Sequence, residues 1–197
     1  MKDFWNKRYS EINYAYGKEP NQFFKEGILN STGGKILFPA EGEGRNAVYA
    51  AKNGWDSYAF DISEEGKQKA DALANENDVS IKYIVSDFKD VNYPDGYFDC
   101  IVLVFAHVPA NMRNDFHEKM IRLLKDGGRI LLEGFSKEQL SKSTGGPKNE
   151  TMLFSKDMLL DDFSGLSSFE VEEKEVDLNE GPYHKGLASV IQLIGTK

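Results

Sequence analysis

The chain has 197 residues and a formal net charge of −8, from 32 acidic and 24 basic side chains. Hydrophobic residues make up 40% of it and charged residues 28%, which excludes a disordered or fibrous class. The acid surplus disfavours nucleic acid as a partner, because phosphates would be repelled over most of the surface. One cysteine and three histidines are too few for a common structural zinc site, so we expect no bound metal.

The sequence indicates where the protein works and how it is divided. It has no run of 18 apolar residues, and its opening residues, MKDFWNKRYSE, lack the apolar core of a signal peptide. We therefore expect a cytoplasmic protein with no membrane partner. Residues 1–197 fit one domain by length, whereas the oligomeric state does not follow from the sequence.

An aromatic-rich segment precedes the first predicted strand. Within residues 1–30 it contains Phe4, Trp5, Tyr9, Tyr14, Tyr16, Phe23 and Phe24. We expect it to form an N-terminal cover that either packs on the sheet or closes over a pocket. Packing is the favoured alternative, because buried aromatic side chains usually belong to a core.

Apolar runs rich in β-branched residues alternate with helical patterns through the middle of the chain. The runs are 35–40, 57–62, 81–87, 98–105 and 128–135, and the helical patterns are 45–54, 63–77 and 111–128. Ser63 is the expected cap of the second helix, and Gly127 and Gly128 are the expected end of the third. This alternation predicts an α/β fold, doubly wound and Rossmann-like, with a mostly parallel sheet.

The pattern changes in the last third of the chain. A short helix capped by Ser155 is predicted at 155–163, followed by strands at 169–178 and 186–196. The segment between these strands is too short for a crossover helix, so they should form an antiparallel C-terminal edge hairpin. Residues 136–151 form a long polar stretch, which is either a lid over a pocket or a surface loop.

The turn after the first predicted strand reads AEGEGRNA. Gly42, Gly44 and Ala47 fit the GxGxxA form of the dinucleotide-binding fingerprint. Asp61 ends the next predicted strand, where such folds bind a ribose hydroxyl pair. These residues permit an NAD-dependent oxidoreductase.

Two acids in the same turn favour another ligand. Glu41 and Glu43 flank Gly42 and would repel a pyrophosphate, unless both point into solvent. S-adenosylmethionine carries an ammonium and a sulfonium but no phosphate, and its adenosine suits Asp61. Asp87, at the end of the third strand, could accept a hydrogen bond from adenine while Phe88 packs on the ring; a turn aspartate is the alternative.

Four stretches of the sequence resemble a known family. The strings KILFPAEGEGRNAVYAAKNGWDSYAFDIS, SDF, YFDCIVLVFAHVP and KDGGRILLEGF, spanning residues 35 to 135, are similar to class I S-adenosylmethionine-dependent methyltransferases. The chain looks most like the tellurite-resistance and thiopurine methyltransferase branch, which has a proline where Pro39 stands. The resemblance implies a cofactor site that includes Gly42, Gly44, Asn46, Asp61, Asp87 and Phe88. We expect Glu41, Ile62 and Phe105 to belong to the same cofactor site. Phe38 replaces the acid usual in the first motif, which leaves a non-catalytic cofactor-binding protein as an alternative.

Two loops contain candidate residues for catalysis and for binding the methyl acceptor. Methyl transfer needs a base only if the acceptor must lose a proton. His107, after the fourth strand, is the catalytic candidate. The alternative is that His107 only makes a structural hydrogen bond. Tyr183 and His184, in the loop of the edge hairpin, are candidates for binding the substrate. The alternative is that this loop is an ordinary exposed turn. The acid surplus favours a small-molecule acceptor.

Overall fold

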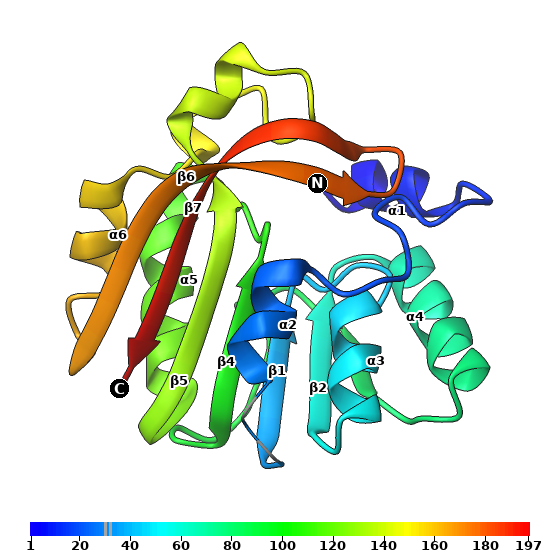
Figure 1. Ribbon diagram of the computed structural model, residues 1–197. Helices are drawn as coiled ribbons and strands as arrows, with labels where there is room; N and C mark the ends of the chain where they lie inside the picture. Colours follow the sequence, from blue (N-terminus) through cyan, green and yellow to red (C-terminus); the bar gives the residue numbers. More distant parts are fainter. Residues whose placement is uncertain (30, 32) are drawn as a thin grey trace.

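The computed structural model describes residues 1–29, 31 and 33–197, so residue 30 of the predicted N-terminal cover lies outside the described part. Its centre is a seven-stranded sheet in the order β3-β2-β1-β4-β5-β7-β6 (Figure 1). The first five strands pair in parallel, and β7 runs antiparallel to both β5 and β6. The predicted Rossmann-like fold and its antiparallel edge are thus confirmed. The strands are β1 (Lys35–Pro39), β2 (Asp56–Asp61), β3 (Lys82–Val85), β4 (Phe98–Val104), β5 (Leu124–Phe135), β6 (Ser168–Glu180) and β7 (His184–Thr196).

Helices cover both faces of the sheet. On one face α5 and α6 bury Phe116 and Leu159 against Leu103. On the other face α2 and α3 bury Phe24 and Ala47 in a second cluster. None of the helices in the described ranges has the length and apolar character needed to cross a bilayer. The helices are α1 (Lys2–Tyr9), α2 (Gln22–Ile28), α3 (Arg45–Lys52), α4 (Glu64–Glu76), α5 (Ala110–Leu123), α6 (Lys156–Asp162) and the short 3₁₀ helices η1 (Lys137–Ser141) and η2 (Glu150–Met152).

The predicted caps form, but one helix is shorter than predicted. The hydroxyl of Ser63 accepts from the backbone N–H of Gly66 at 3.0 Å, and Ser155 caps α6 in the same way. The α5 helix ends at Leu123 rather than at Gly127. Leu124 instead pairs with Phe98 of β4 and begins β5, so strand pairing replaces the last helical turn that the spacing suggested.

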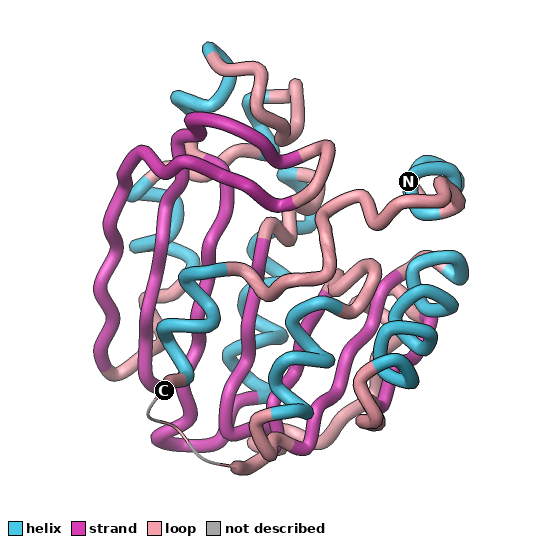
Figure 2. The backbone as a smooth tube through the Cα atoms, turned by 45° about the vertical axis from the view of Figure 1, so that its right-hand side comes forward, coloured by secondary structure: helices cyan, strands magenta, loops and turns pink. Residues whose placement is uncertain are grey.

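The edge hairpin is longer than predicted and reaches over the sheet. Its strands pair without interruption from Ser168 and Thr196 to Glu180 and His184, so only a tight turn separates them. Figure 1 and Figure 2 show the hairpin bending over the carboxyl ends of the parallel strands towards the N-terminal segment. The backbone N–H of Tyr183 donates to the carbonyl of Ala15 at 3.3 Å and joins these two segments. The hairpin turn thereby reaches the edge where ligands bind in this fold.

Candidate cofactor and acceptor site

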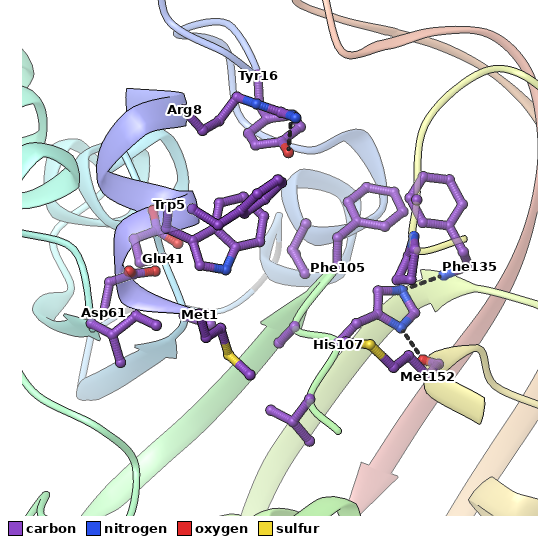
Figure 3. Close-up of a pocket in the computed structure, with 18 of the residues that line it drawn as sticks. Met1, Trp5, Arg8, Tyr16, Glu41, Asp61, Phe105, His107, Phe135 and Met152 are labelled. Carbon is purple, nitrogen blue, oxygen red and sulfur yellow. Dashed lines mark hydrogen bonds between the residues drawn. The ribbon is translucent and has the colours of Figure 1, made fainter. Parts of the chain in front are cut away.

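A cavity of about 610 Å³ lies at the carboxyl ends of the parallel strands. Glu41 and Asp61 lie at one end of it, and His107 lies at the other, beside Phe105 and Phe135 (Figure 3). Helix α1 and the hairpin turn complete the wall. The volume is within the range usual for sites that bind small molecules and cofactors.

Asp61 ends β2 with its carboxylate at the cavity. Its two oxygens accept from the backbone N–H groups of Gly42, at 3.1 Å, and Ser63, at 2.9 Å. Burial raises the pKa of Asp61 to about 6, although these hydrogen bonds oppose the shift. The next residue, Ile62, also lines the cavity. The arrangement offers a fixed acceptor to the hydroxyl groups of a ribose.

Glu41 borders the same end and caps α3. One of its oxygens accepts from the backbone N–H groups of Asn46 and Ala47, each at 2.8 Å. Burial raises the pKa of Glu41 to about 7. In the part of the chain that the structure describes, neither Glu41 nor Asp61 forms an ion pair with a basic side chain. A positively charged ligand would supply the missing counter-charge, so these residues fit S-adenosylmethionine.

Glu43 corrects the expectation that two acids of the turn face the ligand. Its carboxylate is buried away from the cavity, where it accepts from the backbone N–H of Ala15 at 2.7 Å and from Lys69 at 2.8 Å. Glu43 therefore neither lines the cavity nor points into solvent. It ties the N-terminal segment to helix α4.

The two predicted glycines shape the turn without bordering the cavity. Gly42 has φ of 65°, and a Cβ there would lie 2.5 Å from the hydroxyl of Tyr9. Gly44 has φ of 88°, and a Cβ there would lie 2.6 Å from the Cβ of Ala70. Both positions require glycine. Their observed role is to let α1 and α4 approach the turn, whereas contact with a cofactor stays a prediction.

The other predicted cofactor residues line the cavity. Asp87 follows β3, and one of its oxygens accepts from the backbone N–H of Lys89 at 3.0 Å, which is also the turn geometry of the alternative interpretation. Phe88 packs edge-on against Phe116 with ring centroids 5.1 Å apart. Asn46 accepts from the backbone N–H of Asn21 at 2.9 Å. These contacts hold the residues in place around the predicted adenosine position.

Strained backbone occurs at two positions in the cavity wall. Ala40 and Phe105 follow the neighbouring strands β1 and β4 and have φ of 53° and 51°, values that L-residues rarely adopt. Both residues line the cavity. Strain of this kind persists where the surrounding structure enforces it, and it is concentrated at functional sites.

His107 lies at the far end of the cavity, with both ring nitrogens engaged (Figure 3). Nδ1 is 2.7 Å from the carbonyl oxygen of Met152, and Nε2 accepts from the backbone N–H of Phe135 at 2.9 Å. Burial lowers the pKa of His107 to about 4. In this geometry His107 has no free lone pair, and it ties the loop after β4 to β5 and η2. Its role as a base stays a prediction.

The hairpin turn brings Tyr183 and His184 to the cavity wall. The hydroxyl of Tyr183 donates to Glu11 at 2.6 Å, and the guanidinium of Arg8 lies 3.6 Å above its ring. The side chain of His184 is buried against Tyr16. The hairpin turn is therefore part of the wall and not the ordinary exposed turn of the alternative interpretation, whereas contact of Tyr183 and His184 with a substrate stays a prediction.

Two segments of the wall carry residues that were not predicted as site residues. Trp5 and Arg8 of α1 line the cavity, and Phe24 of the N-terminal segment is buried in the core; a role of the segment as a cover stays a prediction. The predicted polar loop 136–151 contains η1 and the start of η2, and its residues 145–149 line the cavity opposite α1. Phe135 and Met152 were also missed, although the position of Phe135 at the end of a predicted strand is a usable signal.

Comparison with known proteins supports the same assignment. Residues 39–132 match a family model described as a methyltransferase domain. Over 58 residues the chain is 34% identical to the ubiquinone/menaquinone biosynthesis C-methyltransferase UbiE of Pseudomonas fluorescens, covering 29% of this chain and 23% of that relative. The chain thus spans about a quarter of the length of the curated relatives that it matches.

Solved structures are similar in fold over a larger part of the chain. TehB from Haemophilus influenzae has a TM-score of 0.73 at 17% identity, over 100% of this chain and 66% of that one. The structure titled "Conversion of a Disulfide Bond into a Thioacetal Group during Echinomycin Biosynthesis" has a TM-score of 0.75 at 16% identity, over 99% and 90%. Residues 39–132 thus match the model of a methyltransferase domain, and this match supports the predicted enzyme class and its cofactor, S-adenosylmethionine.

Proposed function

We propose that the protein transfers a methyl group from S-adenosylmethionine to a small, largely apolar acceptor. The observation that carries this proposal is one cavity that joins two chemically different ends. At one end Glu41 and Asp61 supply carboxylates that form no ion pair with the described basic side chains, and at the other Phe105 and Phe135 supply an aromatic wall. A charged cofactor and an apolar acceptor could therefore meet inside it.

Each end has a separate task in this proposal. Bound S-adenosylmethionine supplies a methyl group activated by its sulfonium. Asp61 accepts hydrogen bonds from the ribose, Glu41 balances positive charge, and Asp87 with Phe88 holds the adenine. Helix α1 and the loop 145–149 keep water away from the acceptor, so that the chain contributes mainly by positioning the reactants.

The finer assignments belong to this proposal as well. Pro39, the covering helix α1 and the fold similarity to TehB support a relationship to the tellurite-resistance branch. We expect residues 1–197 to act as one domain with a small-molecule partner and without nucleic acid. The cytoplasm stays the compartment predicted from composition.

The test measures binding and turnover separately. Calorimetric titration should show binding of S-adenosylmethionine and S-adenosylhomocysteine but none of NAD; the reverse result would favour an oxidoreductase. Release of S-adenosylhomocysteine is then measured with a panel of thiols, metalloid oxyanions, phenols and amines. Binding without release across that panel would favour the non-catalytic alternative, whereas release that is lost in Asp61→Ala supports the enzyme.

A further inference from the structure

His184 lies where the edge hairpin bends over the cavity. It begins β7 directly opposite Glu180, the last residue of β6. Its side chain is 5% exposed and lines the cavity. The imidazole lies against three aromatic rings, with centroid distances of 4.4 Å to Tyr16, 4.5 Å to Phe105 and 5.1 Å to Phe135. These contacts hold it in one orientation at the acceptor end.

The two ring nitrogens of His184 have different surroundings. Nδ1 lies 3.4 Å from a carboxylate oxygen of Glu180. A carboxylate only accepts, so this contact favours a proton on Nδ1 and a lone pair on Nε2. Nε2 makes no hydrogen bond within the described ranges, and it is not among their buried polar atoms that lack a partner. Unlike the nitrogens of His107, it is free to meet a molecule in the cavity.

Glu180 is fixed from two further sides. Arg45 donates to it at 2.8 Å and Asn21 donates at 3.0 Å, and its side chain is 11% exposed. Burial acts to raise the pKa of Glu180, but the hydrogen bond from His184 and the charge of Arg45 outweigh burial and hold the pKa at about 2. A permanent negative charge therefore lies behind Nδ1.

Groups from several elements determine the charge of His184. Burial lowers its pKa most, Glu180 on β6 raises it, and Arg45 on α3 and Arg8 on α1 lower it. Tyr16 and His107 are the other titratable groups that face it, and both are neutral at pH 7. The imidazole is accordingly neutral at pH 7 and able to accept a proton.

We propose that His184 is the base that takes the proton of the acceptor, and that Glu180 is its positioning residue; this inference rests on the proposed function. A carboxylate behind an imidazole orients the ring and stabilises its protonated form. As the acceptor atom bonds to the methyl carbon, the carbon–sulfur bond breaks and its electron pair stays on sulfur. The proton of the acceptor moves to Nε2 and later passes to solvent.

This role specifies the class of acceptor. A base is needed for a hydroxyl, thiol or amine that still holds its proton at neutral pH, and not for an anion that is already ionised. The rings of Phe105 and Phe135 favour an aromatic body that carries this group. Suitable probes are therefore 2-naphthol, which is protonated at neutral pH, and 4-nitrothiophenol, which is ionised.

The first experiment measures S-adenosylhomocysteine release with both probes. His184→Gln should lower the rate with 2-naphthol about 100-fold and change the rate with 4-nitrothiophenol less than about threefold. Glu180→Gln should move the acid limb of the 2-naphthol pH profile to lower pH, because losing the carboxylate lowers the pKa of His184. Glu173→Gln is the matched control, since it makes the same substitution at an exposed position of β6 and should leave both rates unchanged.

The second experiment does not depend on turnover. The imidazole signals of His184, assigned by their loss in His184→Gln, are followed by NMR in the S-adenosylhomocysteine complex. They should titrate with a pKa below 6.5, titrate lower still in Glu180→Gln, and shift when 2-naphthol is added. Equal rate losses with the two probes, or unmoved His184 signals with 2-naphthol, would overturn the role of His184 and leave the proposed function standing. A wild-type protein that binds no S-adenosylmethionine would overturn both.

Discussion

Arg45 and Glu180 form a buried ion pair of 2.8 Å that joins the first turn of α3 to the end of β6. Their side chains are 7% and 11% exposed, so solvent screens the pair little. Arg45 also donates to the carbonyl of Tyr16 at 3.1 Å. The turn between β1 and α3, the hairpin and the N-terminal segment therefore meet at one charge pair.

Removing Arg45 should cost far more stability than removing an exposed arginine. Arg45→Leu leaves Glu180 buried without its cation, and we expect a loss of roughly 3 kcal/mol in the free energy of unfolding measured in urea. Arg122→Leu breaks the exposed pair with Asp95 and should cost less than about 1 kcal/mol. Similar losses in the two variants would show that the buried Arg45–Glu180 pair stabilises the fold no more than an exposed pair does.

The same pair predicts a stability change in acid. The pKa of Glu180 is held at about 2, below its unfolded value of about 4.3, so the pair stabilises the fold fully above the unfolded pKa. This contribution should be lost as the pH falls from about 4.3 to about 2. In Arg45→Leu the free energy of unfolding should depend less steeply on pH in that window. An unchanged dependence would show that other carboxylates cause it.

Gly44 should tolerate substitution much less than a glycine of similar backbone conformation in open space. A Cβ at Gly44 would lie 2.8 Å from the Cα of Ala70, whereas a Cβ at Gly54, where φ is 83°, meets nothing within 4 Å. Gly44→Ala should therefore cost at least about 3 kcal/mol, and Gly54→Ala about 1 kcal/mol for the backbone conformation alone. Thermal unfolding of the two variants measures the difference, and equal shifts would contradict the contact with α4.

Cofactor affinity should depend on the ionisation of Asp61. Burial raises the pKa of Asp61 to about 6, and a ribose is held by the charged form. Protonation of Asp61 alone should therefore raise the Kd for S-adenosylhomocysteine by up to about tenfold per pH unit below pH 6. Asp61→Asn should bind more weakly and lose this dependence. Retention of the dependence in that variant would show that another group causes it.

Glu41 should contribute a separate pH dependence to cofactor binding. Its pKa is raised by burial to about 7, so its negative charge is lost at higher pH than that of Asp61. Glu41→Gln should remove the change in S-adenosylhomocysteine affinity near pH 7 and keep the change near pH 6. Calorimetry between pH 5 and 8 resolves the two, and loss of both changes in Glu41→Gln would show that the carboxylates do not act independently.

The sequence predicted most helices, strands and turns because the signals for them lie in residues that are close together in the chain. The cap at Ser63 and the glycine at Gly44 depend on residues nearby in the chain or on one backbone angle. The predicted end of α5 was wrong because Leu124 pairs with Phe98, a partner that helical spacing does not reveal. Strand pairing between distant segments overrides local preference at such positions.

The lining of the cavity was most predictable where the end of a strand determines the position of a residue. Asp61 and Asp87 follow strands of a parallel sheet, so they reach the cavity edge by topology alone. The partners of Glu43 come from α4 and the N-terminal segment, and no pattern in the turn reveals them. The orientation of His184 depends on the bend of a long hairpin, which the sequence signals only as a turn.

Trp5 should slow the escape of the cofactor. It stacks on Tyr9 at 5.4 Å in α1 and lines the cavity, so Trp5→Ala opens the cover. We expect S-adenosylhomocysteine to dissociate about tenfold faster, as seen by stopped-flow fluorescence, since one large aromatic contact is worth about 1.4 kcal/mol. Ile12→Ala, at a side chain that is 98% exposed, is the control and should change nothing. An unchanged rate in Trp5→Ala would show that α1 is not a cover.

His107 should stabilise the loop after β4 rather than set the pH profile. His107→Ala removes the partners of Phe135 and Met152 and should lower the free energy of unfolding by about 2 kcal/mol. The acid limb of the 2-naphthol profile should persist in this variant. Its disappearance in His107→Ala, with the limb intact in His184→Gln, would return the role of base to His107.

The central claim is that Glu41 and Asp61 form the end of the cavity that binds S-adenosylmethionine. Its most direct test is calorimetric titration of the wild type and Asp61→Asn with S-adenosylhomocysteine and with NAD at pH 7.5. We predict one site for S-adenosylhomocysteine, a Kd at least about tenfold higher in Asp61→Asn, and no heat of binding with NAD. Binding of NAD alone, or S-adenosylhomocysteine affinity that is the same in both proteins, would contradict the claim.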